Sequence, residues 1–295
     1  MTFNDDARID TSRASKRSGG RKGGIAIGGG LGAVALVLLG QLLGVDLSGL
    51  TGGGGSAGDG ATTESLDRCA DASLANTDTE CRMVGTADSL DDFWSQTYPA
   101  LAQAEYRPSH VTLFEDAVGT ACGNATSAVG PFYCPGDEEI YLDVAFFEDL
   151  RTRLGADGGA FAQMYVVAHE WGHHVSHLTG AMAAADRSGT GPTSDAVRLE
   201  LQADCYAGAW AAAAATTTDD QGVALIEPPT DAQIADALDA AAAVGDDRIQ
   251  EAATGQVSPE SWTHGSAEQR QRWFTAGYEG GPAACTTFEV AGTDL

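Results

Sequence analysis

Two histidines and a glutamate share one short segment, HEWGH at positions 169–173. On a helix, residues four positions apart lie on one face, so His169 and His173 can direct two imidazoles at one point. Neutral imidazole binds zinc, and a neighbouring carboxylate can take a proton from metal-bound water. The pattern arises by chance in on the order of 1% of chains of this length. It therefore predicts a Zn²⁺ site with His169 and His173 as ligands and Glu170 as general base.

A zinc site of this kind needs a third protein ligand. The candidates elsewhere in the sequence are His174, His177, Glu200, Asp204 and His264. On a helix, His174 is rotated by about 100° from His173, and His177 lies about 6 Å further along the axis. Neither side chain converges easily with the first two histidines. The segment HEWGHHVSHLTG also departs from the pattern HExxHxxGxxH, in which a third histidine follows on the same stretch.

Glu200 is the favoured third ligand. It lies in RLELQAD, 198–204, within the next predicted helix, and antiparallel packing of that helix would bring Glu200 against the two histidines. Asp204 lies one turn later on the same face. From there it could accept a hydrogen bond from the outer nitrogen of His169 or His173. The roles of Glu200 and Asp204 could also be exchanged.

The elements that must position these residues form a short β region followed by helices. The expected strands are 110–116 and EEIYLD at 138–143. Apolar periodicity predicts helices at 88–104 with a bend near Pro99, 158–178, 194–215, 230–244 and 266–278. Thr230 or Asp231 is expected to cap the fourth helix, and Ser266 with Gln269 forms a capping box at the fifth. This order predicts a helix-rich α+β fold.

Six cysteines lie beyond residue 65, and an even number favours disulfides in an exported protein. The spacing suggests the pairs Cys69–Cys81, Cys122–Cys134 and Cys205–Cys285. The first two would be local staples, and the third would tie the C-terminal segment to a central helix. Six cysteines allow fifteen pairings, so this pairing is a hypothesis. No two of them form a CxxC pair, so a cysteine zinc site is not expected.

Residues 25–45, IAIGGGLGAVALVLLGQLLGV, are uncharged and apolar. At about 1.5 Å per residue, a helix of this length reaches roughly 30 Å, the thickness of the hydrocarbon layer of a membrane. Six basic residues precede this segment and predict that the N-terminus stays cytoplasmic. A cleaved signal peptide is the competing interpretation, but the apolar run is longer than a signal sequence and no A-x-A-like site follows it.

These features predict a cytoplasmic basic N-terminus (1–24), a transmembrane anchor (25–45), a glycine-rich linker (46–64) and an extracytoplasmic domain (65–295). The expected location is the cell membrane, with a single pass through the N-terminal helix. From residue 45 onward the chain has ten arginines and 39 acidic residues, and the whole chain has a formal net charge of −26. Such an acidic domain repels the phosphates of nucleic acids, so DNA and RNA are not expected partners.

Four segments carry a family resemblance: HEWGHHV at 169–175, LELQADCYAGAWA at 199–211, THGSAEQRQRWFTAGYEGG at 263–281 and ACTTFE at 284–289. With the basic N-terminus, the apolar segment and the glycine-rich tether, they resemble the YpfJ-type neutral zinc metallopeptidase family. The resemblance covers nearly the whole chain. It implies a zincin-like metallopeptidase domain with Zn²⁺ as cofactor and a peptide or protein as substrate.

The order HExxH…ExxxD is similar to that of the gluzincin branch of zinc peptidases. This likeness implies that His169, His173 and Glu200 are ligands, that Glu170 is the base, and that Asp204 orients a ligand. The chain departs from well-known gluzincins in the interval of 27 positions between His173 and Glu200, which is a longer insert.

Peptide hydrolysis also needs a hydrogen-bond donor for the oxyanion that forms when water attacks the carbonyl. THGSAEQR places His264 just before a predicted helix, where a loop could bring it to the site. A surface or capping role for His264 is the alternative, and Tyr206 or Tyr278 could supply the donor instead. The segment EEIYLD could be an edge strand that aligns an extended peptide.

The sequence thus predicts a membrane-anchored zinc peptidase. Two other interpretations are open. The chain could be a zinc-stabilised envelope binding or scaffold protein without turnover, because the same ligands would stabilise the fold. It could also be a zinc hydrolase that acts on a non-peptide amide. Glu170 argues against a purely structural site, since such a site has no need of a base.

Overall fold

The structure is a computed structural model that describes residues 1–18, 62–153 and 158–295. Its main helices are α2 (Ala72–Ala75), α3 (Thr79–Ala102), α4 (Phe146–Arg153), α5 (Ala160–Leu178), α6 (Ala181–Ala184), α7 (Asp195–Ala213), α8 (Asp231–Ala243), α9 (Asp246–Thr254) and α10 (Ala267–Gly280). One sheet has the strand order β2 (Thr62–Glu64), β1 (Ala14–Ser18), β3 (His110–Phe114), β7 (Glu139–Leu142) and β6 (Phe132–Cys134). A separate hairpin pairs β4 (Ala117–Thr120) with β5 (Gly123–Thr126). The expected helix-rich α+β class is confirmed.

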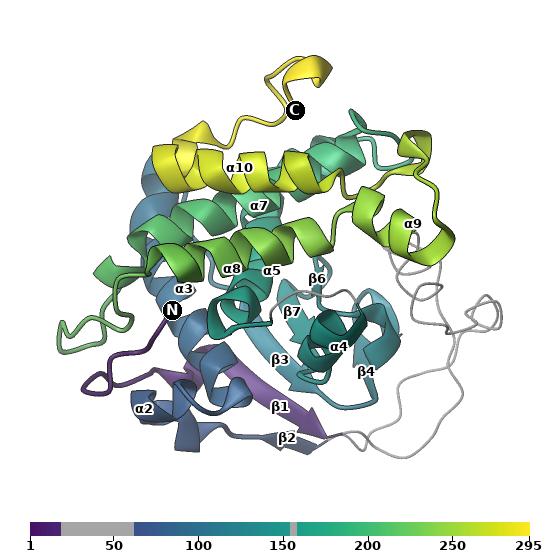
Figure 1. Cartoon of the computed structure of the whole chain (residues 1–295). Helices are drawn as coiled ribbons and strands as arrows, with labels where there is room; N and C mark the ends of the chain where they lie inside the picture. Colours follow the sequence, from purple (N-terminus) through teal and green to yellow (C-terminus); the bar gives the residue numbers. More distant parts are fainter. Residues whose placement is uncertain (19–61, 154–157) are drawn as a thin grey trace.

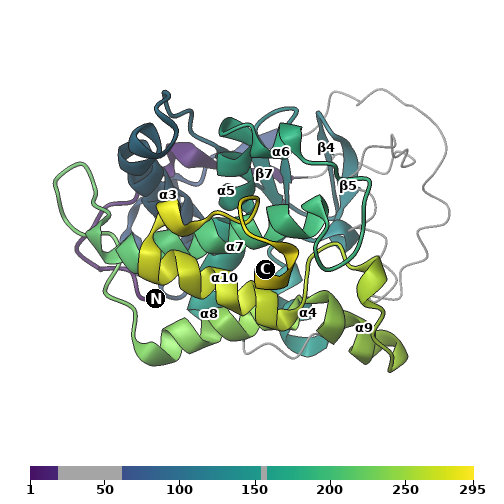
Figure 2. The same ribbon diagram turned by 90° about the horizontal axis from the view of Figure 1, so that it is seen from above.

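Helices α7, α8 and α10 form a layer above the five-stranded sheet, whereas α2 and α4 lie beside the strands (Figure 1). Helix α7 lies between α5 and α10, and α8 runs alongside them, as the view from above also shows (Figure 2). The sheet packs against α3 and α5. Helix α5 therefore stands at the junction of the two layers, with strands on one side and the α7–α10 pair on the other.

The five helices expected from sequence correspond to α3, α5, α7, α8 and α10. Capping boxes are present at Thr230 before α8 and at Ser266 before α10. Helix α3 begins at Thr79 rather than at residue 88, because the Asp78 side chain accepts a hydrogen bond from the backbone N–H of Cys81 at 3.0 Å and caps an earlier first turn. Pro99 lies inside α3 without ending it.

The edge-strand expectation for EEIYLD is wrong. This segment forms β7, which is parallel to β3 on one side and antiparallel to β6 on the other. Strand β6 is one of the two edges of the described sheet, and its Phe132 pairs with Tyr141 of β7. The alternating pattern of residues 138–143 predicts a strand. It does not reveal that the short segment Phe132–Cys134 pairs with this strand on the side away from β3.

Residues 1–18 are part of the folded body, and the rest of the segment predicted at 1–24 lies outside the described residues. Strand β1 lies inside the sheet, between β2 and β3. Met1, Phe3 and Ile9 are buried in the main hydrophobic core. Burial of these apolar side chains against α3 and its neighbours stabilises the N-terminal segment on the domain.

The expected transmembrane anchor and single-pass membrane location are corrected. Within residues 1–18, 62–153 and 158–295, no helix combines the length and the apolar composition that a membrane crossing requires. The predicted span, 25–45, lies outside the described residues.

Three glycines allow the backbones of α5, α7 and α10 to approach closely. A Cβ added at Gly172 of α5 would lie 2.7 Å from the carbonyl oxygen of Ala203 in α7. Added at Gly277 of α10, it would overlap the carbonyl oxygen of Cys205, and added at Gly208 of α7 it would overlap the backbone of α10. A glycine inside a helix costs about 1 kcal/mol relative to alanine. The close contacts explain why this cost is tolerated here.

We expect Gly277→Ala to destabilise the protein, although alanine is the better helix former. The added methyl group meets backbone rather than a flexible side chain, so α10 must move away from α7, and such overpacking costs about 1–3 kcal/mol or more. Thermal unfolding followed by circular dichroism measures the effect. Glu279→Ala, at an exposed position of the same helix, is the control and should leave the melting temperature nearly unchanged. An equal melting temperature for Gly277→Ala and wild type would contradict the packing account.

Candidate metal centre

Helices α5 and α7 bring together His169, His173 and Glu200. Their potential ligand atoms all lie within 4.8 Å of one another. The Nε2 atom of His169 is 3.2 Å from one Glu200 carboxylate oxygen, and Nε2 of His173 is 3.5 Å from the other. Ligand atoms bound at 2.0–2.1 Å to a tetrahedral zinc ion lie about 3.3 Å apart. The donor set and its spacing therefore fit a zinc ion, with room for a further, non-protein ligand on the cavity side.

Asp204 lies directly behind His169. Its Oδ1 atom is 2.8 Å from Nδ1 of His169, and its side chain has no exposed surface. This contact holds the proton of His169 on Nδ1 and leaves the Nε2 lone pair for a metal. Nδ1 of His173, the other imidazole, is buried and has no hydrogen-bond partner among the described residues. The structure thus places Asp204 on His169 rather than on His173.

Arg270 of α10 compensates the buried charge of Asp204. Its Nε and one terminal nitrogen donate to the two Asp204 oxygens at 2.8 and 3.0 Å. The Tyr165 hydroxyl donates to Asp204 as well, and it accepts a hydrogen bond from Arg270 at 3.2 Å. A buried carboxylate is tolerated when it is paired and hydrogen-bonded in this way. Neither Tyr165 nor Arg270 was identified from sequence, because they lie 39 and 66 positions from Asp204.

The electrostatics of the site favour a bound cation. Although burial alone lowers the pKa of His169, Asp204 and Glu200 raise it to about 10. Burial alone would raise the pKa of Glu200, but His173 and His169 hold it well below its ordinary value. Asp204 behaves similarly, since Arg270 and His169 lower its pKa against the effect of burial. Two ionised carboxylates therefore face the imidazoles, and a metal bound there replaces a proton as the compensating charge.

Glu170 lies beside the three candidate ligands. It is 8% exposed and lines the same cavity as His169, His173 and Glu200. Its side chain forms no hydrogen bond within the part of the chain that the structure describes. A carboxylate in this position is free to accept a proton from a water molecule in the cavity.

His174 and His177 do not join the cluster. His174 is fully buried, and its two ring nitrogens lie 2.7 Å from the carbonyl oxygen of Arg107 and 3.1 Å from the Tyr133 hydroxyl. Burial lowers the pKa of His174 to about 4, so this ring is neutral and structural. His177 lies 3.5 Å from a carboxylate oxygen of Glu138 instead. Both positions agree with helix geometry, in which His174 is rotated away from His173 and His177 lies further along the helix axis.

His264 lines the cavity from the loop before α10. Its Nδ1 atom is 3.1 Å from Oδ1 of Asp246, and the other Asp246 oxygen accepts hydrogen bonds from the backbone N–H groups of Thr263, His264 and Gly265. Asp246 thus fixes both the loop and the ring. Asp246 was not identified from the sequence, because this residue begins the short helix α9 and lies 18 positions before His264. Tyr206 packs edge-on against Trp94 and Tyr278 stacks on Phe274, and neither lines the cavity.

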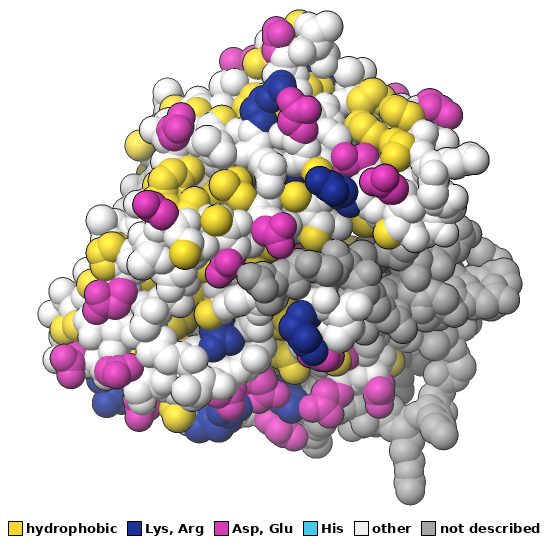
Figure 3. Space-filling model, viewed as in Figure 1, with side chains coloured by type: hydrophobic (Ala, Val, Ile, Leu, Met, Phe, Trp, Pro, Cys, Tyr) yellow, Lys and Arg dark blue, Asp and Glu magenta, His cyan; other side chains and the backbone are white. Residues whose placement is uncertain are grey.

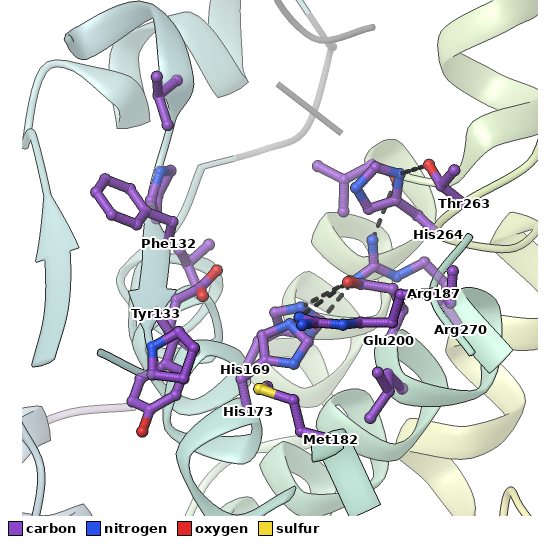
Figure 4. Close-up of a pocket in the computed structure, with 18 of the residues that line it drawn as sticks. Phe132, Tyr133, His169, His173, Met182, Arg187, Glu200, Thr263, His264 and Arg270 are labelled. Carbon is purple, nitrogen blue, oxygen red and sulfur yellow. Dashed lines mark hydrogen bonds and ion pairs between the residues drawn. The ribbon is translucent and has the colours of Figure 1, made fainter. Parts of the chain in front are cut away.

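The cavity has a volume of about 320 Å³ and lies between the helical layer and the edge of the sheet. Figure 4 shows Phe132 and Tyr133 of β6 on one wall, His264 and Arg270 on the other, and the two metal-site histidines between them. Much of the lining is apolar, with Val129, Phe146 and Met182 among the contributors. A cleft of this size, apolar walls and a few convergent polar groups are typical of ligand sites.

The structure contains disulfides between the three cysteine pairs suggested by the spacing: Cys69–Cys81, Cys122–Cys134 and Cys205–Cys285. Two of them fasten elements that carry cavity residues. Cys134 ends strand β6, so its disulfide ties the edge strand to the β4–β5 connection. Cys205 follows Asp204 on α7, and its disulfide fastens the C-terminal segment to the helix that carries Glu200.

Arg270→Met is expected to weaken both folding and metal binding, because it leaves Asp204 buried without its cation. Breaking a buried pair costs about 3–5 kcal/mol, and loss of the group that orients a ligand lowers metal affinity about 10- to 100-fold. Chemical denaturation and a zinc competition assay measure the two effects. Arg272→Met changes an exposed arginine of the same helix and should alter stability by less than about 1 kcal/mol. Similar results for the two variants would contradict the role assigned to Arg270.

Sequence comparisons identify a family and several relatives of this chain. A family described as "Putative neutral zinc metallopeptidase" matches residues 3–288. The protein Rv2575 of Mycobacterium tuberculosis is 48% identical over 295 residues, which cover 99% of each chain. The protein YpfJ of Escherichia coli is 37% identical over 267 residues, which cover 88% of this chain and 86% of YpfJ. Both relatives carry the description "uncharacterized".

No solved structure gave a significant match to this chain. The family match includes the HEWGH segment, Glu200, Asp204 and the loop of His264. On the extent of this match and the identity to its relatives, the chain belongs to the family of neutral zinc metallopeptidases.

Proposed function

We propose that this protein is a zinc-dependent peptidase that hydrolyses peptide bonds with Glu170 as general base. The observation that carries the proposal is the convergence of His169, His173 and Glu200 within 4.8 Å, beside Glu170 and on the wall of a cavity. Structural zinc sites have four protein ligands and are closed, whereas catalytic sites have three and stay open. Three convergent donors at an open cavity therefore favour catalysis over a scaffold role.

The two imidazoles and the Glu200 carboxylate would hold the ion. Zinc bound there supplies Lewis acidity and lowers the pKa of a bound water toward about 7. Glu170 accepts the proton of the attacking water and later delivers it to the leaving amine. Asp204 and Arg270 keep His169 in the tautomer and orientation that the ion requires.

His264 is placed to donate a hydrogen bond to the oxyanion. Its Nδ1 atom is occupied by Asp246, which leaves Nε2 as the nitrogen available to the cavity. Burial lowers the pKa of His264, but Asp246 and Glu200 outweigh this effect and raise it above the ordinary value of about 6.5. The raised pKa favours the ring with a proton on both nitrogens, and in that form His264 can donate from Nε2.

Strand β6 supports a peptide substrate in particular. It is an edge strand of the described sheet, and its residues Phe132 and Tyr133 line the cavity next to the metal-site residues. An exposed strand edge offers backbone N–H and C=O groups to an extended peptide, and the neighbouring cavity takes its side chains. A peptide bound along β6 would pass the metal site with its backbone aligned.

Glu170→Gln tests the base directly. The substitution keeps the shape of the side chain but cannot accept the proton, so hydrolysis should fall about 10²- to 10⁴-fold while zinc stays bound. Metal content by mass spectrometry and cleavage of an internally quenched peptide library, with and without chelator, provide the readouts. Glu251→Gln, at an exposed position on α9, is the matched control. Wild-type activity in Glu170→Gln would show that the base is assigned wrongly.

The pH dependence tests His264. As pH rises through its raised pKa, His264 loses the proton it donates, so kcat/KM should decline on the alkaline side with an apparent pKa above about 6.5. Asp246→Asn removes the charge that raises this pKa, so the decline should begin at lower pH. In His264→Ala the decline should disappear, and kcat should fall about 10²- to 10³-fold. An alkaline limb that is the same in all three proteins would exclude His264 as the donor.

A further inference from the structure

The loop between α6 and α7 forms part of the cavity wall and carries Arg187. This side chain lines the same cavity as His169, Glu200 and His264. Figure 4 shows Arg187 extending toward the metal-site residues rather than away from them. The charge that it brings therefore faces the space in which a substrate would lie.

The position of this loop is held by backbone contacts. The Gly191 N–H donates to the carbonyl oxygen of Trp262 at 2.8 Å, and the Thr190 hydroxyl donates to that of Glu260 at 2.8 Å. The N–H of Asp186 donates to the Asp195 carboxylate at the start of α7. The loop is thus fastened both to α7 and to the segment that leads to His264, and Arg187 belongs to the same wall as these residues.

Arg187 has no charge partner in the described part of the chain. The nearest acid in sequence, Asp186, accepts hydrogen bonds from the N–H and the hydroxyl of Ser188 instead. Most of the other arginines form ion pairs with carboxylates: Arg13, Arg17, Arg68, Arg107, Arg151, Arg270 and Arg272. Arg187 is exposed and lies on the cavity wall, so its guanidinium is available to a negatively charged group of a ligand in the cavity.

We infer that Arg187 binds a carboxylate of the peptide substrate, so that the enzyme prefers substrates with a negative charge near the scissile bond. This inference rests on the proposed peptidase function. A guanidinium pairs with a carboxylate through two parallel hydrogen bonds, which gives direction as well as attraction. The only other arginine of the described cavity lining, Arg270, is committed to Asp204 and Tyr165.

The surroundings agree with this chemistry. Acidic side chains are spread over the face seen in Figure 3, and basic ones are fewer. Such a surface repels anionic peptides at long range, so a local cation is needed if an anionic group is to enter the cavity. Met182 and Leu199 line the cavity too, which provides an apolar contact for a side chain next to the carboxylate.

The carboxylate can be the C-terminus of the peptide or a Glu side chain, and matched peptides distinguish the two sources. We suggest internally quenched peptides of one sequence in four forms: free C-terminus, C-terminal amide, amide with one internal Glu, and amide with Gln in its place. Two readouts are needed. The first is kcat/KM for cleavage, and the second is the affinity of zinc-loaded Glu170→Gln for the same peptides, which requires no turnover.

The variants are Arg187→Gln, Arg187→Lys and the control Arg248→Gln, each also combined with Glu170→Gln for binding. Arg248 is exposed, has no ion pair among the described residues and does not line the cavity. We expect a preference of about tenfold for a carboxylate peptide over its neutral counterpart, equivalent to one good charge pair. Arg187→Gln should abolish the preference, Arg187→Lys should retain part of it, and Arg248→Gln should retain all of it.

Equal kcat/KM and equal affinity for charged and neutral peptides would overturn the inference and leave the peptidase proposal intact. So would a preference that survives Arg187→Gln, or one that Arg248→Gln removes to the same extent. If the carboxylate preference appears in binding and depends on Arg187, but wild type shows no chelator-sensitive cleavage, carboxylate binding by Arg187 stands, whereas the peptidase proposal and the substrate preference that rests on it fail.

Discussion

The close contact between α5 and α7 is the constraint on which the metal centre depends. The backbone of Ala203 lies where a side chain on Gly172 would have to be, so the two helices approach without an intervening layer of side chains. Only at this separation can Glu200 reach both imidazoles and Asp204 reach the back of His169. Gly277 allows the same close backbone approach between α7 and α10, and this approach brings Arg270 to Asp204. Small residues at the helix contacts therefore set the distances at the site.

Buried charge is the second consequence of this packing. Asp204 and Arg270 are almost completely inaccessible to solvent, with 0% and 3% of their side chains exposed. Moving both into the interior is costly, and their mutual hydrogen bonds with Tyr165 offset that cost. The network stabilises one tautomer of His169, and it fixes the ring from behind while the front stays open to the cavity. Contacts within the protein thus hold the candidate ligand side chains in place, which lowers the reorganisation that ion binding would require.

The helices and the three candidate metal ligands could be predicted from the sequence because both depend on local patterns. HEWGH places His169 and His173 on one face of a helix, RLELQAD does the same for Glu200 and Asp204, and caps at Thr230 and Ser266 mark where helices begin. Local sequence patterns do not identify Asp246, Arg270 or Arg187, because the roles of these residues arise from contacts between segments far apart in the chain. The strand order could not be predicted from the sequence either, because β6 is only three residues long and lies at one edge of the sheet. The predicted membrane helix rested on the apolar composition of residues outside the described structure.

The central claim is that one zinc ion is held by His169, His173 and Glu200. The most direct measurement is X-ray absorption spectroscopy at the zinc edge on the purified protein, combined with its zinc stoichiometry, for wild type and Glu200→Ala. The account predicts one zinc per chain, with two imidazole nitrogens and oxygen ligands at about 2.0–2.2 Å, and loss or severe weakening of binding in Glu200→Ala. Sulfur ligands, more than two imidazoles, or unchanged zinc binding in Glu200→Ala would contradict it.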